Sequence, residues 1–187
     1  MIIIFGFALL ILTIGMVVLI AMFGELSARV TEAGPRIRNT EIVPVENSRL
    51  GHVPGSWPAA LPSEREGLSV ILVLSSACSS CADIASQLRE NPSYAQLNET
   101  AVVVSTAHRR TGEEFITRYE LAQFPHYIDE GGAWVSGEFG VHSSPSALVF
   151  HSSELIAAYI FHDIGALQAK VSQLTARDAR DQQREAV

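Results

Sequence analysis

The hydrophobic pattern between residues 68 and 105 predicts two buried strands with a helix between them. Apolar runs cover residues 68–75 and 101–105, which is typical of strands buried on both faces. Between the runs, apolar residues recur with the i, i+3, i+4, i+7 spacing of one helical face, so we expect a helix over residues 78–90 that ends at Asn91-Pro92. The apolar positions of this helix are Cys81, Ile84, Ala85 and Leu88.

A second helix is expected after the second strand. Thr111 and Glu114 have the spacing of a capping box, in which the Thr hydroxyl caps the helix and the Glu side chain reaches back toward its start. We therefore expect a helix that begins at Thr111 and turns Phe115, Ile116 and Tyr119 inward.

The following segment predicts an edge strand and a short helix. Residues 124–129 combine aromatic and apolar side chains and lead into a Gly-Gly pair, which is typical of a short edge strand. We expect Asp129 and Glu130 to lie in a solvated turn, and residues 134–138 to form one short helical turn.

The end of the chain predicts a hairpin and a closing helix. The apolar runs 146–150 and 154–161 flank a polar tripeptide, which is a hairpin pattern. Ile164, Leu167, Val171 and Leu174 then form one apolar helical face, and the polar residues 177–187 are expected to be a frayed tail. This order of elements indicates the α/β class, with a mixed sheet covered by helices on both faces.

The N-terminal pattern differs from the rest of the chain. Residues 2–23 contain no charged side chain, and at about 1.5 Å per residue a helix of this length spans a hydrocarbon core of roughly 30 Å. We therefore expect a retained single-pass transmembrane anchor over residues 1–24. A cleaved signal peptide is the alternative, but no basic residue precedes the stretch and no cleavage site is obvious after it.

A linker is expected between the anchor and the folded domain. Residues 25–66 are rich in Pro and Gly and lack long apolar runs, which is typical of a tether, with one short strand near residues 41–45. Trp57 is expected to dock on the domain. The domain itself is expected over residues 67–176, before the polar tail.

Composition excludes several classes of function. The chain has 187 residues and a net charge of −7, which does not indicate a nucleic-acid surface. Its 2 cysteines allow neither a four-Cys zinc site nor a disulfide scaffold. We expect no cofactor and no resident metal.

The two cysteines carry the candidate chemistry. Cys78 and Cys81 are separated by Ser79-Ser80 at the junction of the first strand and its helix. Thiols at this spacing in a first helical turn can close a disulfide with little backbone movement. A helix N-terminus favours negative charge, so the first thiol should ionise more easily than a free cysteine. The placement predicts thiol–disulfide exchange, while an inert structural disulfide is the alternative.

Together with a distant Ser-Pro sequence, the cysteine motif resembles the thioredoxin-like superfamily. The chain reads Phe139-Gly-Val-His-Ser-Ser-Pro-Ser-Ala-Leu-Val-Phe150, similar to the aromatic, glycine, cis-proline and hydrophobic strand of that family, and the hairpin and closing helix follow in family order. The resemblance covers roughly residues 68–174. An anchor and an inserted helix and strand over residues 111–128 are similar to membrane-anchored cytochrome-c-maturation and methylamine-utilisation accessory members.

The resemblance implies roles for individual residues. Cys78 would be the nucleophile and Cys81 the resolving cysteine, beside a cis peptide bond before Pro145. The backbone of Ser144 and the neighbouring Ala77 would contact the substrate. The partners implied are protein thiols or disulfides and a redox donor. A trans proline at the start of a strand is the alternative for Pro145.

The chain departs from the family pattern at three places. Ala77 replaces the Trp that precedes the first cysteine, and Ser79-Ser80 replaces Gly-Pro. Leu72 replaces the buried acid that assists proton transfer at the second thiol. The reduction potential therefore stays open within the span of about −270 to −120 mV found among such proteins.

Other functional classes remain open from the sequence. A thioredoxin-fold copper chaperone would use both cysteines and a histidine, with His142 and His162 as candidates. A peroxidase would need a proline where Ile71 stands. A third alternative is a non-catalytic accessory protein whose anchored domain holds a partner.

The sequence also bears on the side of the membrane on which the domain lies. Arg29, Arg36 and Arg38 follow the anchor and argue for a cytoplasmic domain under the positive-inside rule. A large domain can be translocated despite such charges, and the family implies an extracytoplasmic redox domain. We expect the latter.

Overall fold

The computed structural model describes residues 16, 40–62, 67–91, 94 and 99–185. The chain divides into two units, Met1–Arg38 and Asn39–Val187, and the second contains both cysteines. Apart from Met16, the predicted membrane span lies outside the described residues. Within the described ranges, no helix has both the length and the apolar character needed to span a bilayer.

A six-stranded mixed sheet forms the centre of the domain, with the strand order β1-β6-β5-β2-β3-β4. The strands β2, β3 and β4 are parallel, and β5, β6 and β1 add to β2 as successive antiparallel strands. As predicted, β4 is an edge strand and β5–β6 a hairpin. The bounds are β1 Val43–Pro44, β2 Leu68–Ser75, β3 Ala101–Thr106, β4 His126–Glu130, β5 Ser146–His151 and β6 Glu154–Ile160.

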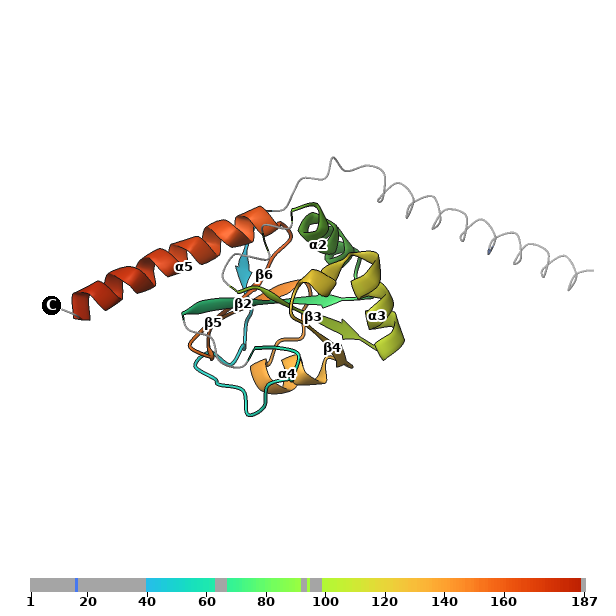
Figure 1. Ribbon diagram of the computed structural model, residues 1–187, viewed down its shortest axis with the longest axis horizontal. Helices are drawn as coiled ribbons and strands as arrows, with labels where there is room; N and C mark the ends of the chain where they lie inside the picture. The colour runs from blue at the N-terminus through green and yellow to red at the C-terminus, as the bar shows by residue number, and fades with distance from the viewer. Residues whose placement is uncertain (1–15, 17–39, 63–66, 92–93, 95–98, 186–187) are drawn as a thin grey trace, which may run out of the picture. The chain divides into compact units, whose positions relative to one another are not determined.

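Helices cover both faces of the sheet, as the sequence predicted (Figure 1). Two successive parallel crossovers, β2-α2-β3 and β3-α3-β4, run in the same direction along the sheet and so place both helices on one face. The closing helix α5 packs on that face too, and α4 packs on the other. The bounds are α2 Ser79–Glu90, α3 Arg109–Arg118, α4 Ala133–Phe139 and α5 Ile164–Glu185, with a short 3-10 turn at Leu121–Gln123.

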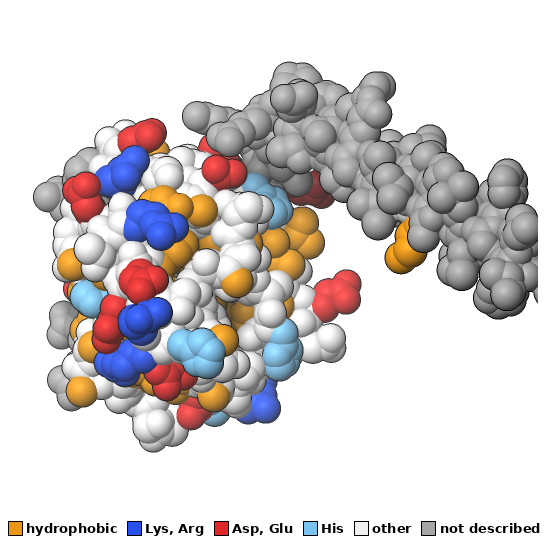
Figure 2. All heavy atoms as spheres, turned by 90° about the vertical axis from the view of Figure 1, so that its right-hand side faces the viewer, with side chains coloured by type: hydrophobic (Ala, Val, Ile, Leu, Met, Phe, Trp, Pro, Cys, Tyr) orange, Lys and Arg blue, Asp and Glu red, His pale blue; other side chains and the backbone are white. Residues whose placement is uncertain are grey.

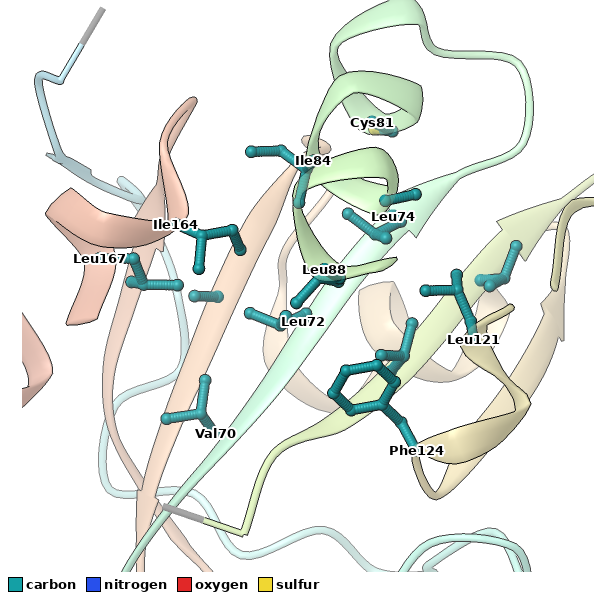
Figure 3. Close-up of a cluster of buried hydrophobic side chains, with 14 of the residues drawn as sticks. Val70, Leu72, Leu74, Cys81, Ile84, Leu88, Leu121, Phe124, Ile164 and Leu167 are labelled. Carbon is teal, nitrogen blue, oxygen red and sulfur yellow. The ribbon is translucent and has the colours of Figure 1, made fainter. Parts of the chain in front are cut away.

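Alternation along β2 divides the core into two layers. Val70, Leu72 and Leu74 pack under α2 and α5, and Figure 3 shows them among the buried side chains of those helices. Ile71 and Val73 pack on the opposite face, toward α4. Burial on both faces explains why β2 reads as an apolar run.

The capping box predicted at Thr111 was wrong. Helix α3 begins at Arg109 with His108 as its N-cap, and the Thr111 N–H already donates to the His108 carbonyl at 3.0 Å. The helix packs closely on β4, because a Cβ added at Gly112 would lie 2.9 Å from Ile128. Glu114 pairs with Arg110 at 3.5 Å along the helix instead of reaching back.

The second half of the predicted linker belongs to the domain. Val43 and Pro44 pair with Tyr159 and Ile160 of β6 as β1, in the region where a short strand was expected. Further along the segment, the Arg49 guanidinium donates to the Gly137 carbonyl at 2.6 Å. Residues 40–62 therefore pack against the sheet and α4, where a tether was predicted.

Trp57 docks on the domain, as predicted. Its ring centroid lies 5.9 Å from that of Trp134 and 5.5 Å from that of Phe150. Phe139 continues the cluster, with its centroid 5.3 Å from that of Phe150. These contacts join the segment before β2 to α4 and β5 across one face of the sheet.

Two further expectations were wrong at the polar ends of elements. Asp129 is only 1% exposed, and its carboxylate accepts the Trp134 and Val135 N–H groups at 3.0 Å each, so it caps α4 rather than lying in a solvated turn. Glu130 is exposed. Helix α5 continues to Glu185, where a frayed tail was expected, because the added residues are mostly good helix formers without Gly or Pro.

Candidate functional site

Cys78 lies where the end of β2 meets the start of α2. Its backbone is extended, with φ −107° and ψ 123°, so it is the N-cap of the helix. The Cys78 Sγ accepts the main-chain N–H of Cys81 at 3.3 Å. A sulfur thus occupies the place where a Ser or Asp oxygen normally caps a helix, close to its positive end.

Cys81 lies one turn further along α2, on its buried face. Its side chain is 0% exposed and belongs to the apolar cluster under the helix, whereas Cys78 is half-buried. Both are free thiols in this structure. The first thiol is therefore accessible and the second is shielded, as the helical register predicted.

The environment lowers the pKa of the Cys78 thiol. Partial burial alone would raise this pKa, but hydrogen bonds from the Cys81 thiol, the Ser80 hydroxyl and the main-chain N–H groups of both residues favour the thiolate and outweigh it. The Ser80 Oγ lies 3.1 Å from the Cys78 Sγ. Cys78 is thus the thiol that ionises first.

Burial acts on Cys81 in the opposite direction. Burial, together with the hydrogen bond that Cys81 gives to Cys78, raises the pKa of the Cys81 thiol to about 12. Hydrogen bonds from the Ser75 backbone and the Ser144 hydroxyl act against this rise. At neutral pH Cys81 is a protonated donor to its neighbour.

The loop before β5 lies against the two thiols. The Ser144–Pro145 peptide bond is cis, as expected, and Pro145 is buried. The Cys78 thiol donates to the Ser144 carbonyl over 3.7 Å. Two segments far apart in the sequence, the start of α2 and the loop preceding β5, therefore meet at the cysteine pair.

A polar cavity of about 200 Å³ lies beside this loop, at the carboxyl ends of β2 and β3. Its walls include Val73, Val135 and Val141, which belong to the core layer on the α4 face. Five serine side chains share the lining: Ser75, Ser105, Ser136, Ser143 and Ser144. The cavity is thus separate from the apolar cluster that encloses Cys81.

The structure also places the predicted substrate contact, the missing acid and the candidate metal ligands. Histidines lie on the surface of the domain (Figure 2). Ala77 is exposed beside Cys78, as its expected contact with a substrate requires. Leu72 is 2% exposed within the apolar cluster, so the place of the missing acid is filled by a hydrocarbon side chain. His142 and His162 are both exposed, and among the described residues no three His, Cys, Asp or Glu side chains form a group that could hold a metal ion.

The Ser80 hydroxyl lies 3.1 Å from the Cys78 sulfur, which agrees with the expectation that the serines between the two thiols can donate to a thiolate. The effect of the Ser144 hydroxyl on Cys81 was not anticipated from the sequence. For Ser144, only the fold brings the hydroxyl to Cys81.

Solved structures provide the comparison for this arrangement. The chain is similar to a putative protein disulfide isomerase from Bacteroides thetaiotaomicron, with 10% identity, a TM-score of 0.52, and coverage of 72% of this chain and 94% of that one. It is also similar to a thioredoxin-like protein in the oxidized form, with 15% identity, a TM-score of 0.50, and coverage of 74% and 98%. The fold is thioredoxin-like.

The chain is also similar to a third structure, at a lower TM-score. It is a secreted disulfide oxidoreductase from Mycobacterium tuberculosis, homologous to E. coli DsbE, with 17% identity, a TM-score of 0.46, and coverage of 59% of this chain and 84% of that one. No family model matches the sequence, and the search of curated proteins gives no significant match. The thioredoxin-like fold therefore rests on the structure, and the chemistry rests on the residues of the site.

Proposed function

We propose that the protein is a membrane-anchored thiol–disulfide oxidoreductase that exchanges a Cys78–Cys81 disulfide with protein partners. The observation that carries the proposal is the asymmetry of the two thiols. Cys78 is half-buried with a lowered pKa, while Cys81 is fully buried with its pKa raised to about 12. An inert structural bridge would need no such difference, whereas an exchanging pair needs one reactive thiol and one protected thiol.

The reaction has two steps. The Cys78 thiolate attacks one sulfur of a partner disulfide and forms a mixed disulfide, and the other partner sulfur leaves as a thiolate. Cys81 then attacks the Cys78 sulfur, which releases the second partner thiolate and leaves the Cys78–Cys81 disulfide. The same steps in reverse oxidise a partner dithiol.

The loop before β5 is suited to orient the partner. The Ser144 carbonyl lies 3.7 Å from the Cys78 sulfur, so a polypeptide paired with this loop would place its own sulfur in line with Cys78. Ala77, next to Cys78 in the chain, is exposed and so open to a partner. Ser144 and Ala77 would thus contact the substrate, and Pro145 would fix the loop.

Trapping tests the assignment of roles. In the full chain, Cys81→Ser removes the resolving thiol, so mixed disulfides with partner proteins should accumulate through Cys78. Cys78→Ser should accumulate none, because the shielded Cys81 cannot reach a partner. Equal trapping by both variants would contradict the assignment.

Residues 2–23 would anchor the domain, which we place on the extracytoplasmic side. Support comes from the apolar composition of this segment and from the need for disulfides to persist outside the reducing cytoplasm. Fusion of alkaline phosphatase to the C-terminus tests the placement, because this enzyme gains its disulfides and its activity only outside the cytoplasm. An inactive but full-length fusion would contradict it.

A further inference from the structure

The loop that contacts Cys78 continues directly from the end of α4. Helix α4 ends at Phe139, and Gly140 follows as its C-cap in the left-handed conformation, with φ 69°. Residues 141–143 alone separate Gly140 from Ser144, whose carbonyl lies 3.7 Å from the Cys78 sulfur. The position of this carbonyl is therefore set from one side by β5 and from the other by the end of α4.

A segment from the N-terminal side of the domain holds that end of α4. Residues 45–57, which we call the strap, run alongside α4 (Figure 1). The strap and Gly140 are in close contact, because a Cβ added at Gly140 would lie 2.9 Å from the Asn47 carbonyl oxygen. The main-chain N–H of Arg49 donates to the Phe139 carbonyl at 2.9 Å. The strap thus contacts the last residue of α4 and the residue from which the loop starts.

Side-chain hydrogen bonds fasten the strap to the same end of the helix. The Arg49 guanidinium donates to the Gly137 carbonyl at 2.6 Å. The Glu138 carboxylate lies 2.9 Å from the His52 Nε2 and accepts the Gly55 N–H at 3.1 Å. Because partly exposed contacts of this kind contribute little to stability, their removal can shift the end of α4 without unfolding the domain.

The strap is also attached to the sheet, so it can act as a fixed support. The Val45 N–H donates to the Ala158 carbonyl at 2.8 Å, and the Gly51 N–H donates to the Leu155 carbonyl at 2.8 Å. The Leu155 N–H donates in turn to the His52 carbonyl at 3.0 Å. Leu155 and Ala158 belong to β6, which pairs with β5, the strand that follows the loop. Both ends of the loop are therefore held by the same pair of strands.

We propose that the strap positions the loop formed by residues 141–145, and so keeps the Ser144 carbonyl where a partner polypeptide can pair beside Cys78. This inference rests on the proposed function, in which that loop orients the partner. Arg49 and Glu138 are positioning residues, since their described contacts are with α4 and the strap. The described contacts of the strap do not reach the start of α2, on which the reactivity of Cys78 depends.

Two matched substrates test this role. One is a short peptide whose central cysteine forms a mixed disulfide with thionitrobenzoate, and the other is the same mixed disulfide on N-acetylcysteine amide, which has no chain to pair with the loop. The Cys78 thiolate bonds to the cysteine sulfur of either substrate, and thionitrobenzoate leaves with the electron pair of the broken bond. Its release gives the rate. In the unmodified full chain the peptide should react faster, and the ratio of the two rates measures pairing with the loop.

A double variant removes the side-chain support of the strap. Arg49→Ala combined with Glu138→Ala eliminates the hydrogen bonds that join Arg49, His52 and Gly55 to the end of α4. It should slow the peptide reaction about tenfold and leave the short substrate within about twofold, because a misplacement of about 1 Å can cost up to roughly a hundredfold in rate. Amide hydrogen exchange should rise in residues 140–144 and stay unchanged in β5.

Two further variants are the controls. Arg49→Lys combined with Glu138→Gln keeps a donor and an acceptor at these positions and should retain most of the peptide rate. Val171→Ala removes a buried side chain under α5, on the opposite face of the sheet, and should lower stability without changing the rate ratio. An unchanged ratio in the double alanine variant, or an equal loss in Val171→Ala, would overturn the role of the strap.

Failure of the proposed function would look different. If Cys78 does not exchange disulfides, the unmodified chain itself releases no thionitrobenzoate from either substrate. Equal rates of the unmodified chain with both substrates would contradict the pairing of a partner with the loop. Hydrogen exchange would still report whether the strap holds the loop. The unmodified chain thus tests the exchange reaction, and the double alanine variant tests the strap.

Discussion

The main-chain N–H of Cys81 donates to the sulfur of Cys78 across 3.3 Å. This contact exists because Cys78 is the N-cap of α2, so its side chain takes the first unpaired N–H groups of the helix. The same turn of helix that exposes Cys78 directs Cys81 into the core. One backbone arrangement therefore produces both the reactive thiol and the protected one.

We expect Cys78 to alkylate as a thiolate at lower pH than an ordinary cysteine. The hydrogen bonds that lower its pKa should shift the midpoint of the rate against pH below that of a free thiol. Iodoacetamide labelling of the reduced protein, followed by peptide mass spectrometry, should modify Cys78 well before Cys81. Preferential labelling of Cys81 would contradict this order.

Ser79 and Ser80 provide a matched pair of variants for the same measurement. The Ser80 hydroxyl lies 3.1 Å from the Cys78 sulfur, so Ser80→Ala should raise the pKa of Cys78 and slow its labelling at neutral pH. Ser79 is exposed, and Ser79→Ala should leave the midpoint unchanged. Equal shifts of the Cys78 pKa in both variants would contradict the specific role of the Ser80 hydroxyl.

The stability of the reduced protein should decline at alkaline pH. Folding holds the pKa of Cys81 above its unfolded value, so the folded state disfavours the thiolate. This contribution to the free energy of unfolding is fully present below pH 9.0 and is lost as the pH rises toward about 12. Between pH 9.0 and about 12, the free energy of urea unfolding should fall more steeply with pH for the unmodified protein than for Cys81→Ala. Parallel declines in the two proteins would contradict this role of Cys81.

Sequence patterns predicted the features that local periodicity determines. The apolar spacing of Cys81 and Leu88 predicted the register of α2 and hence the burial of the second thiol. The cis bond before Pro145 was expected only from the resemblance to the thioredoxin-like superfamily. The patterns failed where long-range contacts decide. Helix α3 begins at Arg109 instead of Thr111, and the role of Asp129 depends on the helix that follows β4.

The segment before β2 illustrates the same limit. Residues 40–62 look like a tether because they lack long apolar runs, yet Trp57, the strand β1 and Arg49 all contact the domain. The sequence suggested both the docking of Trp57 and the strand. It could not show their partners, which are α4 and β5 for Trp57 and β6 for the strand.

Trp57 should therefore contribute to the stability of the domain. It is half-buried between Trp134 and Phe150, so Trp57→Ala should lower the free energy of unfolding by about 2 kcal/mol, less than for a fully buried aromatic side chain. Leu50→Ala, at a side chain 59% exposed, is the control and should change little. Urea denaturation measures both, and equal effects would contradict the packing described.

Asp129 should also stabilise the domain, through α4. Its carboxylate accepts two N–H groups at 3.0 Å each in a buried setting, so Asp129→Asn should cost about 1–3 kcal/mol, the value of a hydrogen bond to a charged group. Glu130→Gln changes the neighbouring exposed carboxylate and should have little effect. Thermal unfolding compares the two, and a larger loss in Glu130→Gln would rule out the assigned cap.

The central claim is that Cys78 and Cys81 form a reversible disulfide with each other. Equilibration of the full chain in glutathione buffers spanning roughly −270 to −120 mV, followed by acid quenching and mass spectrometry, measures this directly. We predict conversion of the free dithiol to an intramolecular disulfide, with a single midpoint and both thiols lost together. Thiols that stay free throughout, or Cys78 carrying glutathione while Cys81 stays free, would contradict the account.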